Sequence, residues 1–142
     1  MDSERFAHLR PSWVAFGWFI AAAMSALVLL GLIALGVLGA SSGAPEGDVW
    51  VAVALLIGFI TGGFFAGARV GRAPVLHGLG IGLFSLLVWL LANLLLPDPG
   101  DPGAWHALPL TVAAGLLLLQ TVAAIVGARM GRRWTRGAEQ VG

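Results

Sequence analysis

The segment GARVGR at residues 67–72 recurs as GARMGR at residues 127–132, an offset of 60 residues. The same offset relates further pairs: Ser25 and Ser85, Leu27 and Leu87, Leu30 and Leu90, Ala54 and Ala114, Thr61 and Thr121. One offset shared by separate segments indicates duplication of a structural unit. We therefore predict two copies of one unit, residues 13–72 and 73–132.

The composition of the chain excludes an ordinary water-soluble domain. Of its 142 residues, 58% are hydrophobic and only 11% are charged, whereas soluble domains contain about 25% charged residues. A helix needs about 20 apolar residues to cross a bilayer. Four stretches meet this requirement: Trp13–Ala40, Val49–Ala68, Val75–Leu96 and Trp105–Ala128.

The predicted spans are separated by residues that end helices. Proline and glycine are concentrated in residues 41–45, 73–74 and 97–103, and both residue types interrupt regular helix. Each repeat then contains two spans and forms a helical hairpin. The prediction is an all-α polytopic membrane four-helix bundle made of two tandem hairpins in a parallel pseudo-repeat, with residues 1–142 forming a single membrane domain.

The arginines predict how the chain is oriented in the membrane. All eight cationic residues are arginines, and all fall on one side of the predicted spans: Arg5, Arg10, Arg69, Arg72, Arg129, Arg132, Arg133 and Arg136. Positive residues favour the cytoplasmic side. We therefore expect residues 1–12 and residues 133–142 to be cytoplasmic segments of a multi-pass protein of a bacterial inner membrane.

Small residues recur at helical spacing within the predicted spans. They form seams, by which we mean stripes of small side chains along one helix face: Gly58, Gly62, Gly63, Gly67, Gly71, Gly78, Gly82, Ala123, Gly127 and Gly131. Such stripes allow close helix packing in lipid. Two interpretations remain open. The seams hold the four helices of one chain together, or one seam faces outward and binds another copy or another membrane protein.

The arginines after the second and fourth spans also have two interpretations. These residues are Arg69, Arg72, Arg129, Arg132 and Arg133. Positive charge at a helix C-terminus favours the helix and anchors the topology. Alternatively, the repeated arginines form a basic ring that binds phospholipid headgroups or another anion.

Few polar side chains occur within the spans, and none carries a charge. The candidates for a polar layer are Ser25, Ser85, Thr61, Thr121 and Gln120. The alternative is that the hydroxyls bond to backbone carbonyls one turn earlier. Charged groups inside a membrane usually mark ion or proton pathways, so their absence argues against a proton- or sodium-coupled pump.

The sequence contains no recognisable catalytic or cofactor-binding pattern. It has no cysteine and no lysine, and its histidines (His8, His77 and His106) are too scattered to suggest a metal site. There is no nucleophile–histidine–carboxylate set and no phosphate loop. We therefore expect no enzymatic activity, no metal, no cofactor and no nucleic-acid partner.

Residues 62–83 resemble a known group of proteins. This stretch combines a glycine-rich helix, the arginine-bearing turn at residues 69–72 and a His77-Gly78 start of the next helix. In these features it is similar to the YrzE-like small four-span bacterial membrane proteins. The resemblance implies four spans and a bacterial inner membrane, but it supplies no activity and no functional residues.

Three functions are compatible with these patterns. The leading hypothesis is a non-enzymatic accessory subunit or self-associating scaffold, which contacts other membrane helices in a homo-oligomer or a larger membrane complex. The alternatives are a small channel or transport component and a protein that binds anionic membrane lipids through its arginines.

Overall fold

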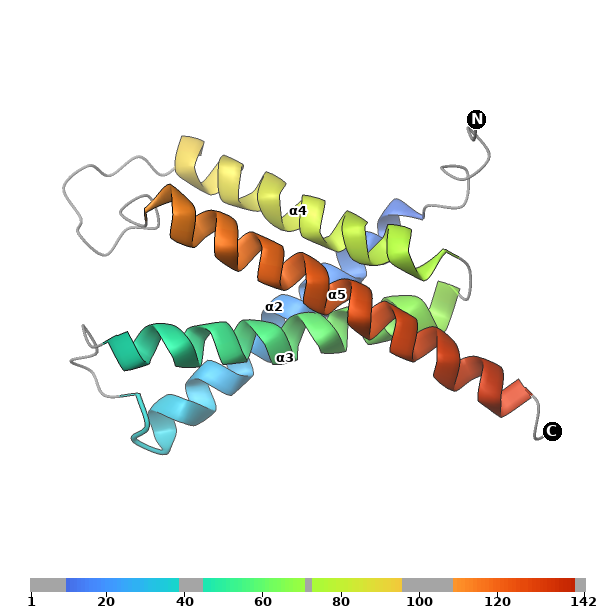
Figure 1. The fold of residues 1–142 in the computed structure, drawn as a ribbon, viewed down its shortest axis with the longest axis horizontal. Coiled ribbons are helices and arrows are strands. Elements are labelled where there is room, and N and C mark those ends of the chain that lie inside the picture. Colours follow the sequence, from blue (N-terminus) through green and yellow to red (C-terminus); the bar gives the residue numbers. More distant parts are fainter. Residues whose placement is uncertain (1–9, 39–44, 71–72, 96–108, 140–142) are drawn as a thin grey trace.

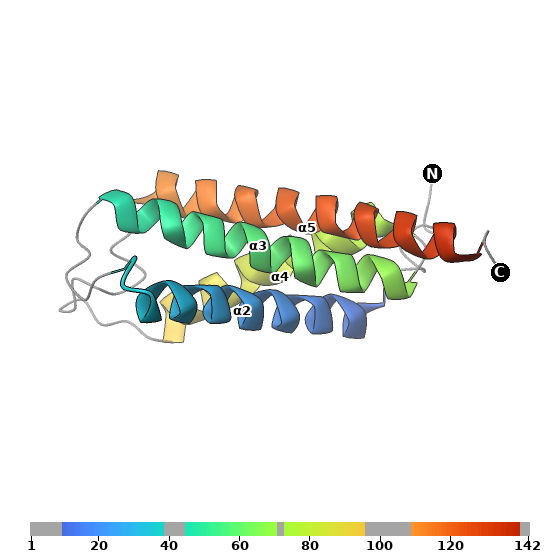
Figure 2. The same ribbon diagram turned by 90° about the horizontal axis from the view of Figure 1, so that it is seen from below.

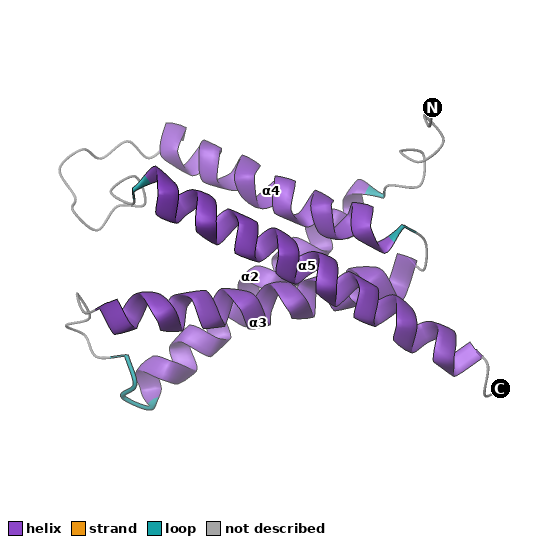
Figure 3. Cartoon of the chain, viewed as in Figure 1, coloured by secondary structure: helices purple, strands orange, loops and turns teal. Residues whose placement is uncertain are grey.

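The chain forms four α-helices that pack against one another in the computed structural model (Figure 1). They are α2 (Pro11–Ala34), α3 (Pro45–Val70), α4 (Pro74–Leu95) and α5 (Leu110–Glu139). The structure describes residues 10–38, 45–70, 73–95 and 109–139, and within these ranges it contains no strand (Figure 3). The predicted all-α four-helix bundle is confirmed.

Each helix is long and apolar enough to cross a membrane. The shortest apolar segments contain 22 residues, which is about 33 Å at 1.5 Å per residue. Large hydrophobic side chains also face outward. Leu27, Leu94 and Leu118 are 62%, 73% and 67% exposed. An apolar outer surface matches lipid rather than water as the surrounding medium, so this is the architecture of a multi-pass membrane protein.

Helices α3 and α5 form the centre of the bundle. They run in the same direction and make the most extensive helix–helix contact, while α2 packs on α3 and α4 packs on α5 (Figures 1 and 2). Helices α2 and α4 therefore begin at the end of the bundle where α3 and α5 finish. We call this end the arginine end, because Arg10, Arg69 and Arg129 to Arg136 lie there.

Close packing is concentrated towards the arginine end. The buried residues of α2 all lie between Val14 and Ser25, and those of α4 all lie between Pro74 and Ser85. Phe59 and Ile81 contribute large side chains to this core. Towards the opposite end, the α2–α3 hairpin and the α4–α5 hairpin diverge (Figure 1).

Helix α2 ends earlier than the sequence predicted. It stops at Ala34 rather than Ala40 because Gly36 adopts a φ of 72°. The amide of Val37 donates to Leu32 O and that of Gly36 donates to Ile33 O, each at 3.0 Å. These two bonds and the left-handed glycine form a Schellman motif, which ends a helix. Hydropathy does not reveal this helix end, because the residues around Gly36 are apolar.

Helix α5 continues well past the end of its predicted span. The prediction ended at Ala128 and treated residues 133–142 as a tail, whereas the helix extends to Glu139. Hydropathy indicates where the apolar segment ends. A helix can continue beyond that point as long as the following residues have adequate helix propensity. The predicted start of this span at Trp105 lies outside the described residues.

Candidate functional site

Two glycines of α3 bring it into backbone contact with α2. A side-chain carbon on Gly62 would overlap the carbonyl oxygen of Gly17, and one on Gly58 would overlap the hydroxyl of Ser25. Larger residues would force the two helices apart. Gly58 and Gly62 therefore fix the spacing within the first hairpin.

Reciprocal glycine contacts join α3 to α5. The contacts are Gly63 with Ala124, Gly67 with Ala128, Gly127 with Ile60 and Gly131 with Phe64. In each pair a carbon added to the glycine would overlap a backbone carbonyl oxygen of the other helix. Ala123 is buried in the core beside this contact. Each helix therefore contributes glycines to one shared seam.

The remaining seam lies between α4 and α5. A carbon added to Gly78 would meet the backbone of Ile125, and one added to Gly82 would meet Thr121. Gly71 lies outside the described residues. Every seam glycine that the structure describes thus contacts another helix of the same chain.

The two threonines of the predicted polar layer bond to their own helices. Thr61 Oγ1 donates to Ile57 O at 2.8 Å, and Thr121 Oγ1 donates to Leu117 O at 2.7 Å. Bonds of this kind satisfy the hydroxyl within one turn of helix. Gln120 is half-buried on α5.

The two serines occupy different helix contacts. Ser85 Oγ accepts a hydrogen bond of 2.8 Å from Trp18 Nε1, which joins α4 to α2. Ser25 is buried against Gly58, and its hydroxyl has no hydrogen-bond partner within the described ranges. The serines therefore serve the α2–α4 and α2–α3 contacts, respectively.

A basic pocket lies between the start of α4 and the last turns of α5. Its volume is about 590 Å³, and it is lined by Ala73–Leu76 together with Arg129, Arg132, Arg133 and Arg136. We call it the arginine pocket.

Helical spacing explains why the four arginines gather. Positions 129, 132, 133 and 136 follow the pattern i, i+3, i+4, i+7, which places side chains on one helix face. Like charges at i and i+4 repel by roughly 0.2–0.5 kcal/mol per pair. An anion held between them would relieve that repulsion.

Arg132 is the most enclosed of the lining arginines. It is half-buried, and its buried Nε atom has no hydrogen-bond partner among the residues that the structure describes. The positive end of the α4 helix dipole faces the same space from Ala73–Leu76. No carboxylate is among the described lining residues.

The pocket includes some of the predicted arginines and omits others. Arg129 and Arg132 were singled out from the repeat and Arg133 from its place after the fourth span, whereas Arg136 and the first turn of α4 were not. Arg69 is exposed at the end of α3 and does not line the pocket. Arg72 lies outside the described residues. The i, i+3, i+4, i+7 pattern is the sequence signal that would have added Arg136.

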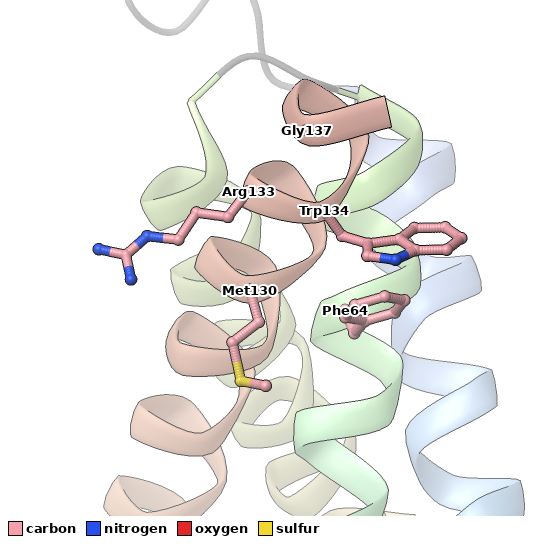
Figure 4. A pocket seen from close by; sticks show the side chains of 5 residues that line it. All are labelled: Phe64, Met130, Arg133, Trp134 and Gly137. Carbon is pink, nitrogen blue, oxygen red and sulfur yellow. The ribbon is translucent and has the colours of Figure 1, made fainter. Parts of the chain in front are cut away.

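A second depression, shallow and mostly apolar, lies beside α5 on its α3 side. It has a volume of about 690 Å³ and is lined by Phe64, Met130, Arg133, Trp134 and Gly137 (Figure 4). We call it the aromatic groove. The rings of Phe64 and Trp134 are 5.9 Å apart between centroids and form one of its walls.

His77 supports the first turn of α4 from within the bundle. Its side chain is fully buried, with Nδ1 3.1 Å from Ala73 O and Nε2 3.5 Å from the backbone amide of Arg10. A neutral ring that donates from Nδ1 to Ala73 O can accept from Arg10 at Nε2. His77 thereby joins the start of α2 to the turn that borders the arginine pocket.

The chemistry available at this end is electrostatic. Arginine stays protonated, and its planar guanidinium pairs with phosphate oxygens in a two-pronged geometry. No group of three or more potential metal-ligating side chains occurs in the portion described by the structure. Comparison of the chain with protein-family models, curated proteins and solved structures found no match.

Proposed function

We propose that this chain is a non-enzymatic membrane protein that binds a phosphate-bearing anion in the arginine pocket. The observation that carries the proposal is the set of four arginines on one face of α5, directed to the first turn of α4. The ligand chemistry is a phosphate group, supplied either by an anionic phospholipid or by a soluble phosphate compound. Such a ligand would pair with guanidinium groups that otherwise repel one another.

The structure gives less support to the other two functional hypotheses. A scaffold that assembles through an outward glycine seam needs an unpaired seam, yet the described seam glycines all contact helices of the same chain. A channel lined by hydroxyl groups needs hydroxyls that can hydrogen-bond to a passing solute, yet the Thr61 and Thr121 hydroxyls bond to backbone carbonyls of their own helices. Membership of the YrzE-like group and location in a bacterial inner membrane stay predictions.

The test compares ligand affinity for two matched arginine variants. The full chain is purified in a zwitterionic detergent, and the affinities for phosphatidylglycerol, phosphatidylcholine, glycerol phosphate and inorganic phosphate are measured. Arg132→Gln should weaken phosphatidylglycerol binding about tenfold or more, because one charge-assisted hydrogen bond contributes about 1.5–3 kcal/mol. Arg69→Gln removes an exposed arginine outside the pocket and serves as the control.

The four ligands separate the two sources of phosphate. Binding of phosphatidylglycerol without glycerol phosphate identifies a lipid site, and comparable binding of glycerol phosphate identifies a soluble ligand. Equal affinity for phosphatidylglycerol and phosphatidylcholine with no binding of either phosphate compound would refute the proposal. Equal losses in Arg132→Gln and Arg69→Gln would refute it as well, since they would indicate unspecific attraction by net charge.

A further inference from the structure

His77 connects the wall of the arginine pocket to the start of α2. Its Nδ1 lies 3.1 Å from the carbonyl oxygen of Ala73, which lines the pocket, and its Nε2 lies 3.5 Å from the backbone amide of Arg10. One orientation of a neutral ring satisfies both contacts, with Nδ1 as the donor and Nε2 as the acceptor. Because the side chain is fully buried, it can act on a ligand in the pocket only through Ala73.

Ala73 needs support because its backbone is strained. Its φ is 48°, in the left-handed region that residues other than glycine rarely adopt. Such a conformation persists where the surrounding structure holds it. The Ala73 carbonyl oxygen accepts from the backbone amides of Leu76 and His77 at 3.1 and 3.3 Å, and the His77 ring adds a third contact. Of these three contacts, the ring is the one that connects Ala73 to another helix.

We propose that His77 is a positioning residue for the phosphate site, and that anion binding in the arginine pocket and docking of the α2 start favour each other through its ring. This inference rests on the proposed function and adds the regulation of that site. An anion between the α5 arginines and the first turn of α4 would contact that turn in the conformation that the ring holds. Two events that favour the same conformation strengthen each other by the same factor.

Position 10 allows the connection to be broken without a change in the core. Arg10 is exposed and extended directly before α2, with a φ of −97°. Proline has a φ of about −65° and no backbone N–H, so Arg10→Pro removes the donor to His77 with a small backbone adjustment. It keeps the Arg10 carbonyl, which accepts from Trp13 and Val14. Arg10→Gln removes the same charge but keeps the amide, so it is the matched control.

The first measurement compares affinities of the full chain for phosphatidylglycerol in a zwitterionic detergent. Arg10→Pro should bind about threefold to fivefold more weakly than Arg10→Gln, as expected for the loss of one hydrogen bond between neutral groups. His77→Asn should show a similar loss relative to the wild type. Asparagine can donate to the carbonyl four residues earlier, as Asn93 does to Trp89 O at 2.7 Å, but it has no atom at the position of Nε2.

The second measurement follows hydrogen exchange of the Arg10 amide by NMR in protein labelled with [15N]arginine. The signal is assigned by its loss in Arg10→Lys. Phosphatidylglycerol should slow this exchange about threefold to fivefold in the wild type, the same factor as the change in affinity. Phosphatidylcholine should not slow it, and phosphatidylglycerol should not slow it in His77→Asn. A purely structural role of His77 would not make the Arg10 amide respond to the lipid.

The other outcomes overturn the inference and identify which part failed. If Arg10→Pro and Arg10→Gln bind phosphatidylglycerol equally while Arg132→Gln binds weakly, the phosphate site stands without the connection through His77. If phosphatidylcholine slows exchange as much as phosphatidylglycerol, or if His77→Asn responds like the wild type, the protection of the α2 start does not come from the pocket through His77. If the wild type binds both lipids equally, the proposed function fails together with this inference.

Discussion

Gly67 shows how a single residue fixes the distance between two helices. A carbon added to it would overlap the backbone of Ala128 on α5. Backbone atoms cannot avoid the added carbon by changing rotamer, as a flexible side chain can, so α3 and α5 would have to separate.

We expect Gly67→Ala to destabilise the protein by about 1–3 kcal/mol, the usual range for overpacking. Gly115→Ala is the matched control, because its added carbon meets open space on the outer face of α5. The measurement is the free energy of unfolding in mixed micelles. Equal stability of the two variants would show that α3 and α5 do not pack through Gly67.

Residue types alone predicted the seams but not their partners. Gly67 and Gly71 belong to the same repeated stripe, and helical spacing indicated which face of each helix is small. Whether that face meets α2, α5 or another molecule depends on tertiary packing, which a single sequence does not encode locally. The early end of α2 was missed because Gly36 lies in an apolar run, where one residue in the left-handed conformation leaves no hydropathy signal.

At the scale of helices, α2 and α4 make a smaller contact than those along the hairpins. The hydrogen bond from Trp18 Nε1 to Ser85 Oγ is a specific polar link between them. Trp18 of α2 also packs edge-on against Phe84 of α4, with ring centroids 5.3 Å apart.

A double-mutant cycle on Trp18→Phe and Ser85→Ala should give a coupling of about 0.6 kcal/mol, the average for hydrogen bonds between membrane helices. The phenylalanine retains an aromatic ring beside Phe84 and removes the donor. Unfolding free energies of the two single variants and the double variant give the coupling. Strictly additive effects would mean that the hydrogen bond contributes nothing measurable.

The arginine pocket was predictable only on the α5 side. Arg129 and Arg132 follow from the repeat, and Arg133 follows Arg132 directly in the sequence. Extending the helix past Ala128 brings Arg136 onto the same face. The other wall, Ala73–Leu76, depends on how α4 docks on α5, and His77 behind it was read as one of three scattered histidines. The aromatic groove joins Phe64 to Trp134 across two helices, so no local pattern indicated it.

At the scale of the whole molecule, the sequence predicted the fold class well, because four long apolar segments directly indicate four helices whose side chains avoid water. Orientation remains a prediction from the one-sided distribution of the arginines. The lack of native cysteine allows each introduced cysteine to be labelled alone.

Single-cysteine variants should reveal that orientation in intact cells. We expect Asp101→Cys to react with a membrane-impermeant maleimide, and Ser3→Cys and Gln140→Cys to react only after the membrane is permeabilised. A control with a permeant maleimide shows that every cysteine is reactive. Labelling of Ser3→Cys in intact cells would reverse the predicted orientation.

The divergence of the two hairpins has a consequence for the surrounding bilayer. The buried residues of α2 and α4 lie towards the arginine end, and the two hairpins diverge towards the opposite end (Figure 1). In a bilayer, such a molecule would occupy a larger area in the leaflet at the diverging end. Copies with the same orientation in the membrane would all displace more lipid from the same leaflet. Their accumulation would add area to one side of the bilayer and give that patch a preferred curvature.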